Sequence, residues 1–258
     1  MKSLRAALAG LIALGLLIIP ATSANASNSW GNYHWARTAN PFTISTVKSL
    51  TPDWVGRTDA ALADWSKSTV LDLAGVAGAS DSQTRRKCPA ISGKIRVCNQ
   101  TYGLNGWLGL ASIHISGSHI VDGTTKLNDS YFNLASYNYE TEKRHVVCQE
   151  VGHDIGLDHT STDGSSQNTC MDYYQNKSNS DTTSTTPNQH DYDQLAAMYS
   201  HLDSSSTVSS ASASSASESW DAGRGVTIIN TVDANGNGYI TRIIWATDLL
   251  GAGRITQS

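Results

Sequence analysis

The stretch that decides the fold is Gln149-Glu150-Val151-Gly152-His153-Asp154-Ile155-Gly156-Leu157-Asp158-His159. On a helix, Gln149 and His153 are one turn apart, so their side chains leave the same face and can reach one ion together. Glu150 lies about 100° further round that turn. A carboxylate there can take a proton from a water held by the ion, which is the position of a general base.

The second half of the stretch adds a turn and another histidine. Gly156 comes three residues after His153, where helices often end because glycine accepts the left-handed conformation. The chain can then turn back and present His159 as a third ligand. His145 cannot replace Gln149, because it precedes His153 by two turns, about 12 Å along the helix axis at the usual rise per residue.

This pattern resembles the extended zinc motif of the metzincin peptidases, H-E-x-x-H-x-x-G-x-x-H, as in matrixin-like, reprolysin-like and snapalysin-like members. Every fixed position is present except the first histidine, which is Gln149 here. Cys170-Met171-Asp172-Tyr173 follows where the Met-turn follows the motif in that family. The resemblance implies a secreted metalloendopeptidase that binds Zn²⁺ and cleaves a protein or peptide substrate. Its implied metal ligands are Gln149, His153 and His159, and its implied catalytic residues are Glu150 and Tyr173.

The same resemblance, which covers about residues 30–202, implies an α/β (α+β) fold with a twisted mixed sheet, three main helices and an active-site helix over a Met-turn. A C-terminal β-hairpin tail is expected from the β-rich runs at 225–232 and 239–246. Strands are expected near residues 41–47, 94–98 and 107–115, with 116–128 as an extended edge segment beside the cleft. Helices are expected at 51–68, 137–152 and 188–201. His114 and His119 are not spaced for the same zinc and are expected to be ordinary histidines.

Gln149 leaves a second interpretation open. A neutral amide oxygen is a poorer zinc donor than imidazole, so a non-catalytic extracellular binding protein that keeps the fold is the alternative. The tail raises a smaller question, since residues 233–238 match half of a calcium loop but Ile244 stands at the twelfth position in place of glutamate. An Asn-Gly hairpin turn is the better interpretation.

The ends of the chain indicate export. Residues 1–26 read as a secretory signal with Lys2, Arg5, an apolar run and an Ala24-Asn25-Ala26 cleavage site. A peptidase domain is expected at 27–203, a Ser/Ala-rich linker at 204–219 and the hairpin tail at 220–258. Loss of Lys2 and Arg5 changes the formal charge from −4 to −6. The expected protein is secreted and extracellular, with no membrane span and no nucleic-acid partner.

Four cysteines remain after processing, and in an oxidising compartment disulfides are the default expectation. Sequence proximity favours Cys88 with Cys98 and Cys148 with Cys170, although two other connectivities exist. The second pair would join the active-site helix to the Met-turn.

Overall fold

The computed structural model describes residues 28–208 and 229–246. The predicted signal (1–26), most of the predicted linker (204–219) and both ends of the predicted tail (220–258) lie outside these residues. The division of the chain into a peptidase domain, a linker and a tail therefore stays a prediction.

The described chain forms a mixed α/β structure with one twisted sheet and few helices. The strands are β1 (His34–Trp35), β2 (Phe42–Ser49), β3 (Leu71–Ala77), β4 (Ile95–Gln100), β5 (Trp107–Ser116), β6 (His119–Asn128), β7 (Ile229–Val232) and β8 (Asn237–Trp245). The helices are α1 (Pro52–Trp65), α2 (Ser82–Lys87), α3 (Asp129–Phe132), α4 (Glu140–Asp154) and α5 (Gln189–Met198).

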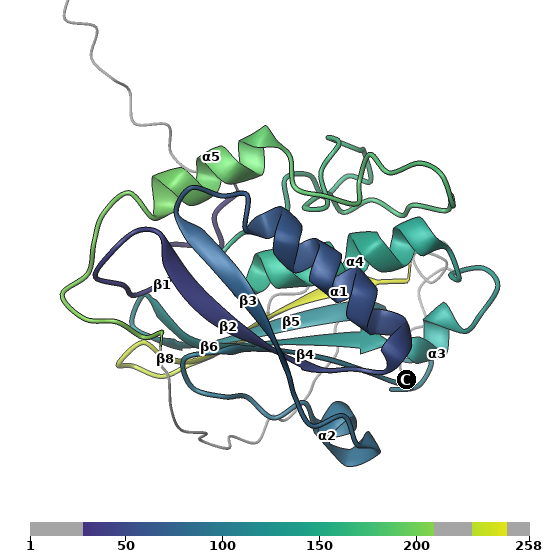
Figure 1. Cartoon of the computed structure of the whole chain (residues 1–258), viewed down its shortest axis with the longest axis horizontal. Coiled ribbons are helices and arrows are strands. Elements are labelled where there is room, and N and C mark those ends of the chain that lie inside the picture. The colour runs from purple at the N-terminus through teal and green to yellow at the C-terminus, as the bar shows by residue number, and fades with distance from the viewer. Residues whose placement is uncertain (1–27, 209–228, 247–258) are drawn as a thin grey trace, which may run out of the picture.

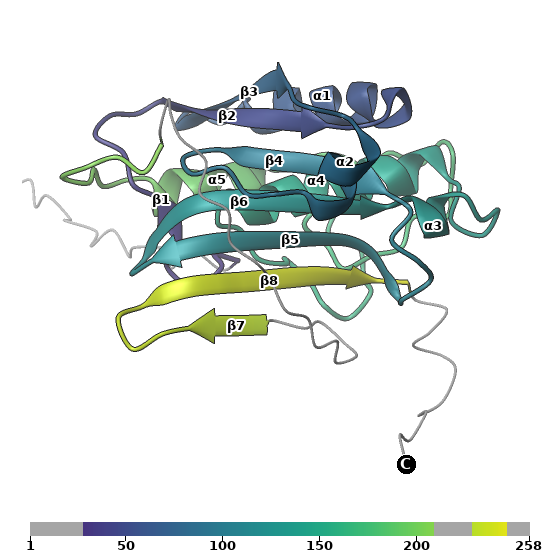
Figure 2. The same ribbon diagram turned by 90° about the horizontal axis from the view of Figure 1, so that it is seen from below.

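The sheet runs in the order β3-β2-β4-β6-β5-β8-β7, and β1 pairs separately with β6 (Figure 2). Strands β2, β3, β4 and β6 are parallel, while β5 is antiparallel to both β6 and β8. The expected edge segment, 116–128, is therefore wrong as an edge. It contains β6, which lies inside the sheet because β5 and then the C-terminal hairpin pair beyond it.

Helices α1 and α4 lie on the same face of the sheet, as Figure 1 shows. Buried tryptophans fix them there. Trp65, at the end of α1, is fully buried and its indole N–H donates to the carbonyl of Cys148 at 3.0 Å. The indole of Trp35 donates to the carbonyl of Asp154, the last residue of α4, at 2.9 Å. These two bonds position α4 over the sheet.

Two helices, α1 and α4, begin without a side-chain capping bond. Pro52 occupies the first turn of α1 as expected, but the hydroxyl of Thr51 makes no capping bond. It accepts instead from the amide of Asn99. At α5, Asn188 and Asp191 form a reciprocal capping box, which satisfies the first free N–H groups of that helix.

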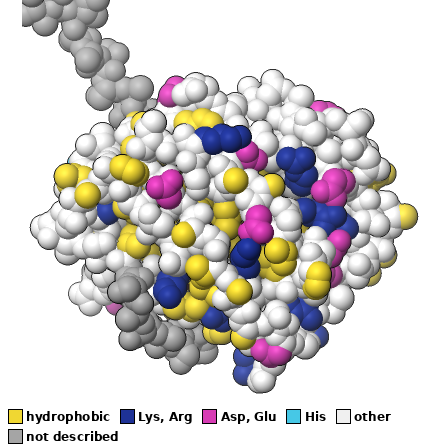
Figure 3. Space-filling view, in the orientation of Figure 1, with side chains coloured by type: hydrophobic (Ala, Val, Ile, Leu, Met, Phe, Trp, Pro, Cys, Tyr) yellow, Lys and Arg dark blue, Asp and Glu magenta, His cyan; other side chains and the backbone are white. Residues whose placement is uncertain are grey.

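Both expected disulfides are present. Cys88 pairs with Cys98 and joins the end of α2 to β4, and Cys148 pairs with Cys170. On the face seen in Figure 3, acidic and basic side chains are interspersed and form no continuous patch of one sign. Within the described part of the chain, no helix has both the length and the apolar character needed to cross a membrane.

Candidate metal centre

Helix α4 is unusual because its second half is buried on every side. All residues from His145 to Asp154 are buried, including the polar ones. The helix therefore presents its polar side chains to the protein interior, where each needs a partner or a ligand. Gln149, Glu150 and His153 all belong to this buried half.

The chain turns sharply after α4 and brings a second histidine back. Gly156 has φ +96°, and a Cβ there would overlap the backbone oxygen of Tyr33, so the turn requires glycine. The Nε2 atoms of His153 and His159 then lie 3.1 Å apart. The expected turn and the expected convergence of these two side chains are both found.

The two imidazoles are prepared to act as ligands. The Nδ1–H of His153 donates to the carbonyl of Leu157 at 2.8 Å, which leaves the Nε2 lone pair facing His159. Burial lowers the pKa of His153 to about 3. Burial and the neighbouring His153 lower the pKa of His159 well below its usual value. Both rings are therefore neutral at neutral pH, which is the form that binds metals.

Gln149 is held by the turn that follows the motif. Its amide nitrogen donates to the carbonyls of Cys170 and Asp172, at 2.8 and 2.6 Å. Its Oε1 atom is buried and has no hydrogen-bond partner among the described residues. The nitrogen is thus committed to the backbone, and the oxygen is the atom left to meet a cation.

Glu150 has an equally unsatisfied carboxyl group. Both of its oxygens are buried without a hydrogen-bond partner in the described chain. Burial, and then the neighbouring Asp154, raise the pKa of Glu150 well above its usual value. The side chain packs on β5 at Gly109, where a Cβ would come within 2.5 Å of Oε1. Only a glycine at that position of the strand leaves room for the carboxyl group.

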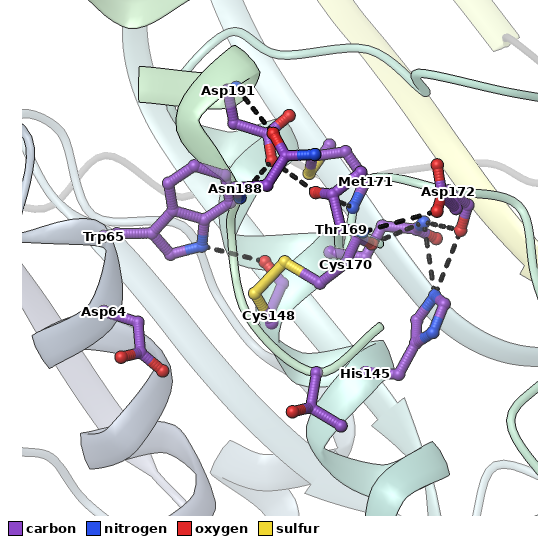
Figure 4. Close-up of a disulfide and its surroundings, with 12 residues drawn as sticks. Asp64, Trp65, His145, Cys148, Thr169, Cys170, Met171, Asp172, Asn188 and Asp191 are labelled. Atoms are coloured by element: carbon purple, nitrogen blue, oxygen red, sulfur yellow. Dashed lines mark hydrogen bonds between the residues drawn. A yellow bond between two sulfur atoms is a disulfide. The ribbon is translucent and has the colours of Figure 1, made fainter. Parts of the chain in front are cut away.

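The disulfide and Met171 form the floor beneath α4. Figure 4 shows the bond from Cys148 on the helix to Cys170, with Met171 beside it. Met171 is fully buried, and a Cβ on Gly152 would overlap its sulfur. The Nε2–H of His145 donates to the carbonyl of Asp172 at 3.1 Å, because a carbonyl oxygen can only accept. His145 therefore supports the turn.

Tyr173 connects the centre to the C-terminal hairpin. Its ring lies edge-on to His159, with ring centroids 5.5 Å apart. Its hydroxyl accepts from the backbone N–H of Trp245, on β8, at 3.1 Å. Burial raises the pKa of Tyr173, so the hydroxyl is a neutral group that can also donate.

The hairpin also supplies a cation beside the histidines. Arg242 on β8 pairs with Asp158, the residue before His159, and its guanidinium lies over the Trp30 ring. A pocket lies between α4, the chain after Met171 and this strand. It is lined by Glu142, His145, Gln149, Tyr173, Tyr174, Gln175, Ile244 and Trp245.

The donor set fits a zinc ion. Two neutral imidazole nitrogens face each other, an orphaned amide oxygen comes from one helical turn earlier, and an unpartnered carboxylate lies next in sequence. Zinc accepts nitrogen and oxygen donors in a four-coordinate site and leaves a position open when three come from the protein. Sequence reasoning missed Arg242, because nothing near it in the sequence links it to the motif. It also gave no role to Asp154, although this residue lies inside the motif directly after His153.

Comparison with known proteins gives distant likenesses to solved structures alone. No protein-family model matches the sequence, and no curated protein matches it. Among solved structures, the chain is similar to archaemetzincin from Archaeoglobus fulgidus, crystallised with malonate. The TM-score is 0.34 and the identity 16%, over 59% of this chain and 99% of that one. A likeness this distant does not place the chain in a family.

Proposed function

We propose that the chain is a secreted zinc-dependent metalloendopeptidase. The observation that carries the proposal is the buried pair of neutral imidazoles, His153 and His159, with facing Nε2 atoms 3.1 Å apart. Glu150, with both carboxyl oxygens unpartnered, lies in the same buried half of α4. Burying these groups without a ligand is costly, and a metal with its water offsets that cost.

Each side chain then has one role. His153, His159 and the Oε1 of Gln149 would hold the ion, while Met171 and the Cys148–Cys170 bond hold the helix over the turn. Zinc, when bound, supplies Lewis-acid activation of a water and of the substrate carbonyl.

Glu150 and Tyr173 handle the proton and the charge. Glu150 accepts a proton from the attacking water and delivers it to the leaving amine, and its raised pKa suits that exchange. The Tyr173 hydroxyl accepts from the N–H of Trp245 and still has its own proton, which it would donate to the developing oxyanion.

Metal content tests the ligand set. Purified mature chain without a histidine tag is compared with Gln149→Ala and His153→Ala by mass spectrometry. Each variant is expected to lose one zinc equivalent that the natural chain keeps. A Gln149→Ala chain with unchanged zinc content would remove Gln149 from the ligands.

Activity tests the general base. Glu150→Gln keeps the size of the side chain and should keep zinc, but is expected to lose hydrolysis of an unfolded protein substrate by about 10²–10⁴-fold. A His114→Ala chain serves as the control, because His114 pairs with Asp122 away from the centre. If Glu150→Gln hydrolyses the substrate at the rate of the natural chain, Glu150 is not the general base.

The alternative function is an extracellular binding protein without turnover. It is favoured by the amide of Gln149, which is engaged with the backbone of Cys170 and Asp172 as a structural residue would be. Gln149→His separates the two functions. If this change creates tight zinc binding and new proteolysis in an inactive chain, the natural protein is the binding protein.

Export is part of the same proposal. The apolar N-terminal stretch with its cleavage site and the two disulfides both suit an oxidising extracellular compartment. Protein found in the medium of expressing cells, cleaved near Ser27, is the expected result.

A further inference from the structure

A second group of side chains that can bind a metal converges at one end of the sheet. This end lies opposite the loop that joins α3 to α4. His34 lies on β1, His119 begins β6, and His201 and Asp203 follow α5. These segments are far apart in the sequence and meet because β1 pairs in parallel with β6, with His34 opposite His119. None of these four residues belongs to the motif around α4.

The ligand atoms of this group point at one another. The Nε2 of His34 lies 3.2 Å from the Nε2 of His201 and 3.5 Å from the Oδ1 of Asp203. The same Oδ1 is 3.3 Å from the Nε2 of His119 and 3.7 Å from that of His201. In a tetrahedral zinc site with metal–nitrogen bonds of about 2.05 Å, neighbouring ligand atoms lie about 3.3 Å apart. Of the six separations among four ligand atoms, these four lie between 3.2 and 3.7 Å, and His34, His119 and Asp203 have all their ligand atoms within 4.8 Å of one another.

Two further contacts orient the ligands. The Nδ1–H of His34 donates to the carbonyl of Asn32 at 2.8 Å, which leaves its Nε2 without a proton and facing the group. The other oxygen of Asp203 pairs with the guanidinium of Arg37 at 2.7 Å. Arg37 also donates to the carbonyl of His201. In metal sites, a ligating histidine usually donates its other ring N–H to a hydrogen-bond acceptor, and a ligating carboxylate is usually hydrogen-bonded as well.

The carboxylate of Asp203 lies at the centre of this group. Its Oδ1 is 3.3 Å from the Nε2 of His119, and the Nε2 atoms of His34 and His201 lie only slightly further from it, at 3.5 and 3.7 Å. Imidazole nitrogens and a carboxylate oxygen are the donors that zinc accepts in proteins.

We propose that His34, His119, His201 and Asp203 form a second zinc site with a structural role. His34, His119 and Asp203 form a group whose ligand atoms all lie within 4.8 Å of one another. His201, half exposed beside His34 and Asp203, would complete a set of four protein ligands by turning its ring toward His119, and that set would leave no open position for a substrate. The proposal does not rest on the proposed peptidase activity.

The site would tie the N-terminal segment to the rest of the chain. Residues next to β1 pair with the stretch that presents His159: Trp30 N donates to Gly156 O at 2.8 Å, and Asp158 N donates to Asn28 O at 2.6 Å. A metal that fixes His34 therefore also steadies the strand against which the turn after α4 rests. Binding of an ion to the folded state alone raises its stability.

Zinc titration of tag-free, chelator-treated chain tests the site. The natural chain is expected to bind two Zn²⁺, and a His153→Ala/His159→Ala chain one. Adding His201→Ala to that double variant should weaken the remaining site by at least about 100-fold, since losing an outer partner alone costs about 10–100-fold. Zn²⁺ should raise the Tm of the double variant and leave that of the triple variant unchanged. His114→Ala, on β5, is the matched control and should keep both ions.

Two results would overturn the site: a double variant that binds no zinc, or a chain with His119→Ala and His201→Ala that still binds two ions. If the double variant does not fold, His201→Ala in the natural chain answers the same question, because that side chain is half exposed after α5 and should leave the fold intact. A natural chain with one ion, lost in His201→Ala and kept in His153→Ala, would support this site and refute the proposed peptidase centre.

Discussion

The two histidine clusters differ in how the chain builds them. His153 and His159 are six residues apart, on one helix and the turn that ends it. His34 and His201 are 167 residues apart and meet only through the sheet. The first cluster can therefore be recognised from a short sequence motif, whereas the second forms only when distant segments pair in the folded sheet.

They also differ in their exposure to solvent. The side chain of His159 is 1% exposed, whereas that of His201 is 51% exposed. A metal in the buried centre would be enclosed by α4, the Met171 turn and the C-terminal hairpin, whereas a metal at the second site would lie at the protein surface beside His201. Changes that disturb the supports of α4 should therefore affect one site and spare the other.

Breaking the Cys148–Cys170 bond should have the largest effect. The bond closes a loop of 22 residues and ties α4 to the turn that holds Gln149. Cys148→Ala/Cys170→Ala is expected to lower the free energy of unfolding by about 3 kcal/mol and to release the zinc of the buried centre only. Denaturant unfolding and zinc content measure both.

Removal of the Cys88–Cys98 bond is the matched control. Its loop is shorter, 10 residues, and it lies between α2 and β4. It should cost somewhat less stability and leave both zinc equivalents bound. If both double variants lose the same zinc, the bond at α4 has no particular link to the centre.

Gly109→Ala should have the next largest effect. A Cβ there meets both Glu150 Oε1 and Val146 Cγ1 at 2.5 Å. Overpacking of this kind costs about 1–3 kcal/mol, and displacing the carboxylate by about 1 Å should lower hydrolysis roughly 100-fold.

Gly56→Ala is the control, because nothing lies within 4 Å of a Cβ on that exposed turn of α1. It should stabilise the chain by about 0.5–1 kcal/mol and keep full activity. If Gly109→Ala hydrolyses the substrate as fast as the natural chain, catalysis does not depend on the present position of the Glu150 carboxyl group.

Sequence patterns predicted the parts of the molecule that are local. Helix α4 and the turn at Gly156 depend on residues within one short stretch, and the two disulfides join cysteines close in sequence. The mixed α/β class was also predicted, through the family resemblance that the same short stretch carries.

Contacts between distant segments could not be predicted in the same way. Residues 116–128 were expected at an edge, but β6 pairs with β4 on one side and with β5 on the other. β8, more than a hundred residues later, then covers β5 as well. His119 has no local partner either, so only the pairing of β1 with β6 brings it to His34. The commitment of the Gln149 amide to Cys170 and Asp172 likewise depends on a turn twenty residues away.

Removal of the C-terminal hairpin should have the smallest of these effects. It also separates the two histidine clusters, because the hairpin contacts the surroundings of the buried one, at Tyr173 and Asp158. Strand β8 pairs with β5 along Trp107–Ser116 and occupies the antiparallel edge that an extended peptide would need for strand addition. Ending the chain after Val208 removes β7 and β8, frees the Tyr173 hydroxyl from Trp245 and opens that edge. Hydrolysis of an unfolded protein substrate is expected to rise roughly tenfold, because an intramolecular strand competes at a high effective concentration.

The second zinc equivalent should be unchanged in this truncated chain, because its ligands end at Asp203. An exposed β5 edge favours aggregation, so Arg242→Gln in the full chain is the companion variant. It breaks the pair with Asp158 and the contact with Trp30 and should raise activity in the same direction by a smaller factor. Lower activity in both chains would mean that the hairpin builds the active site and does not cover it. Unchanged activity would mean that substrate reaches the buried histidines without using the edge of β5.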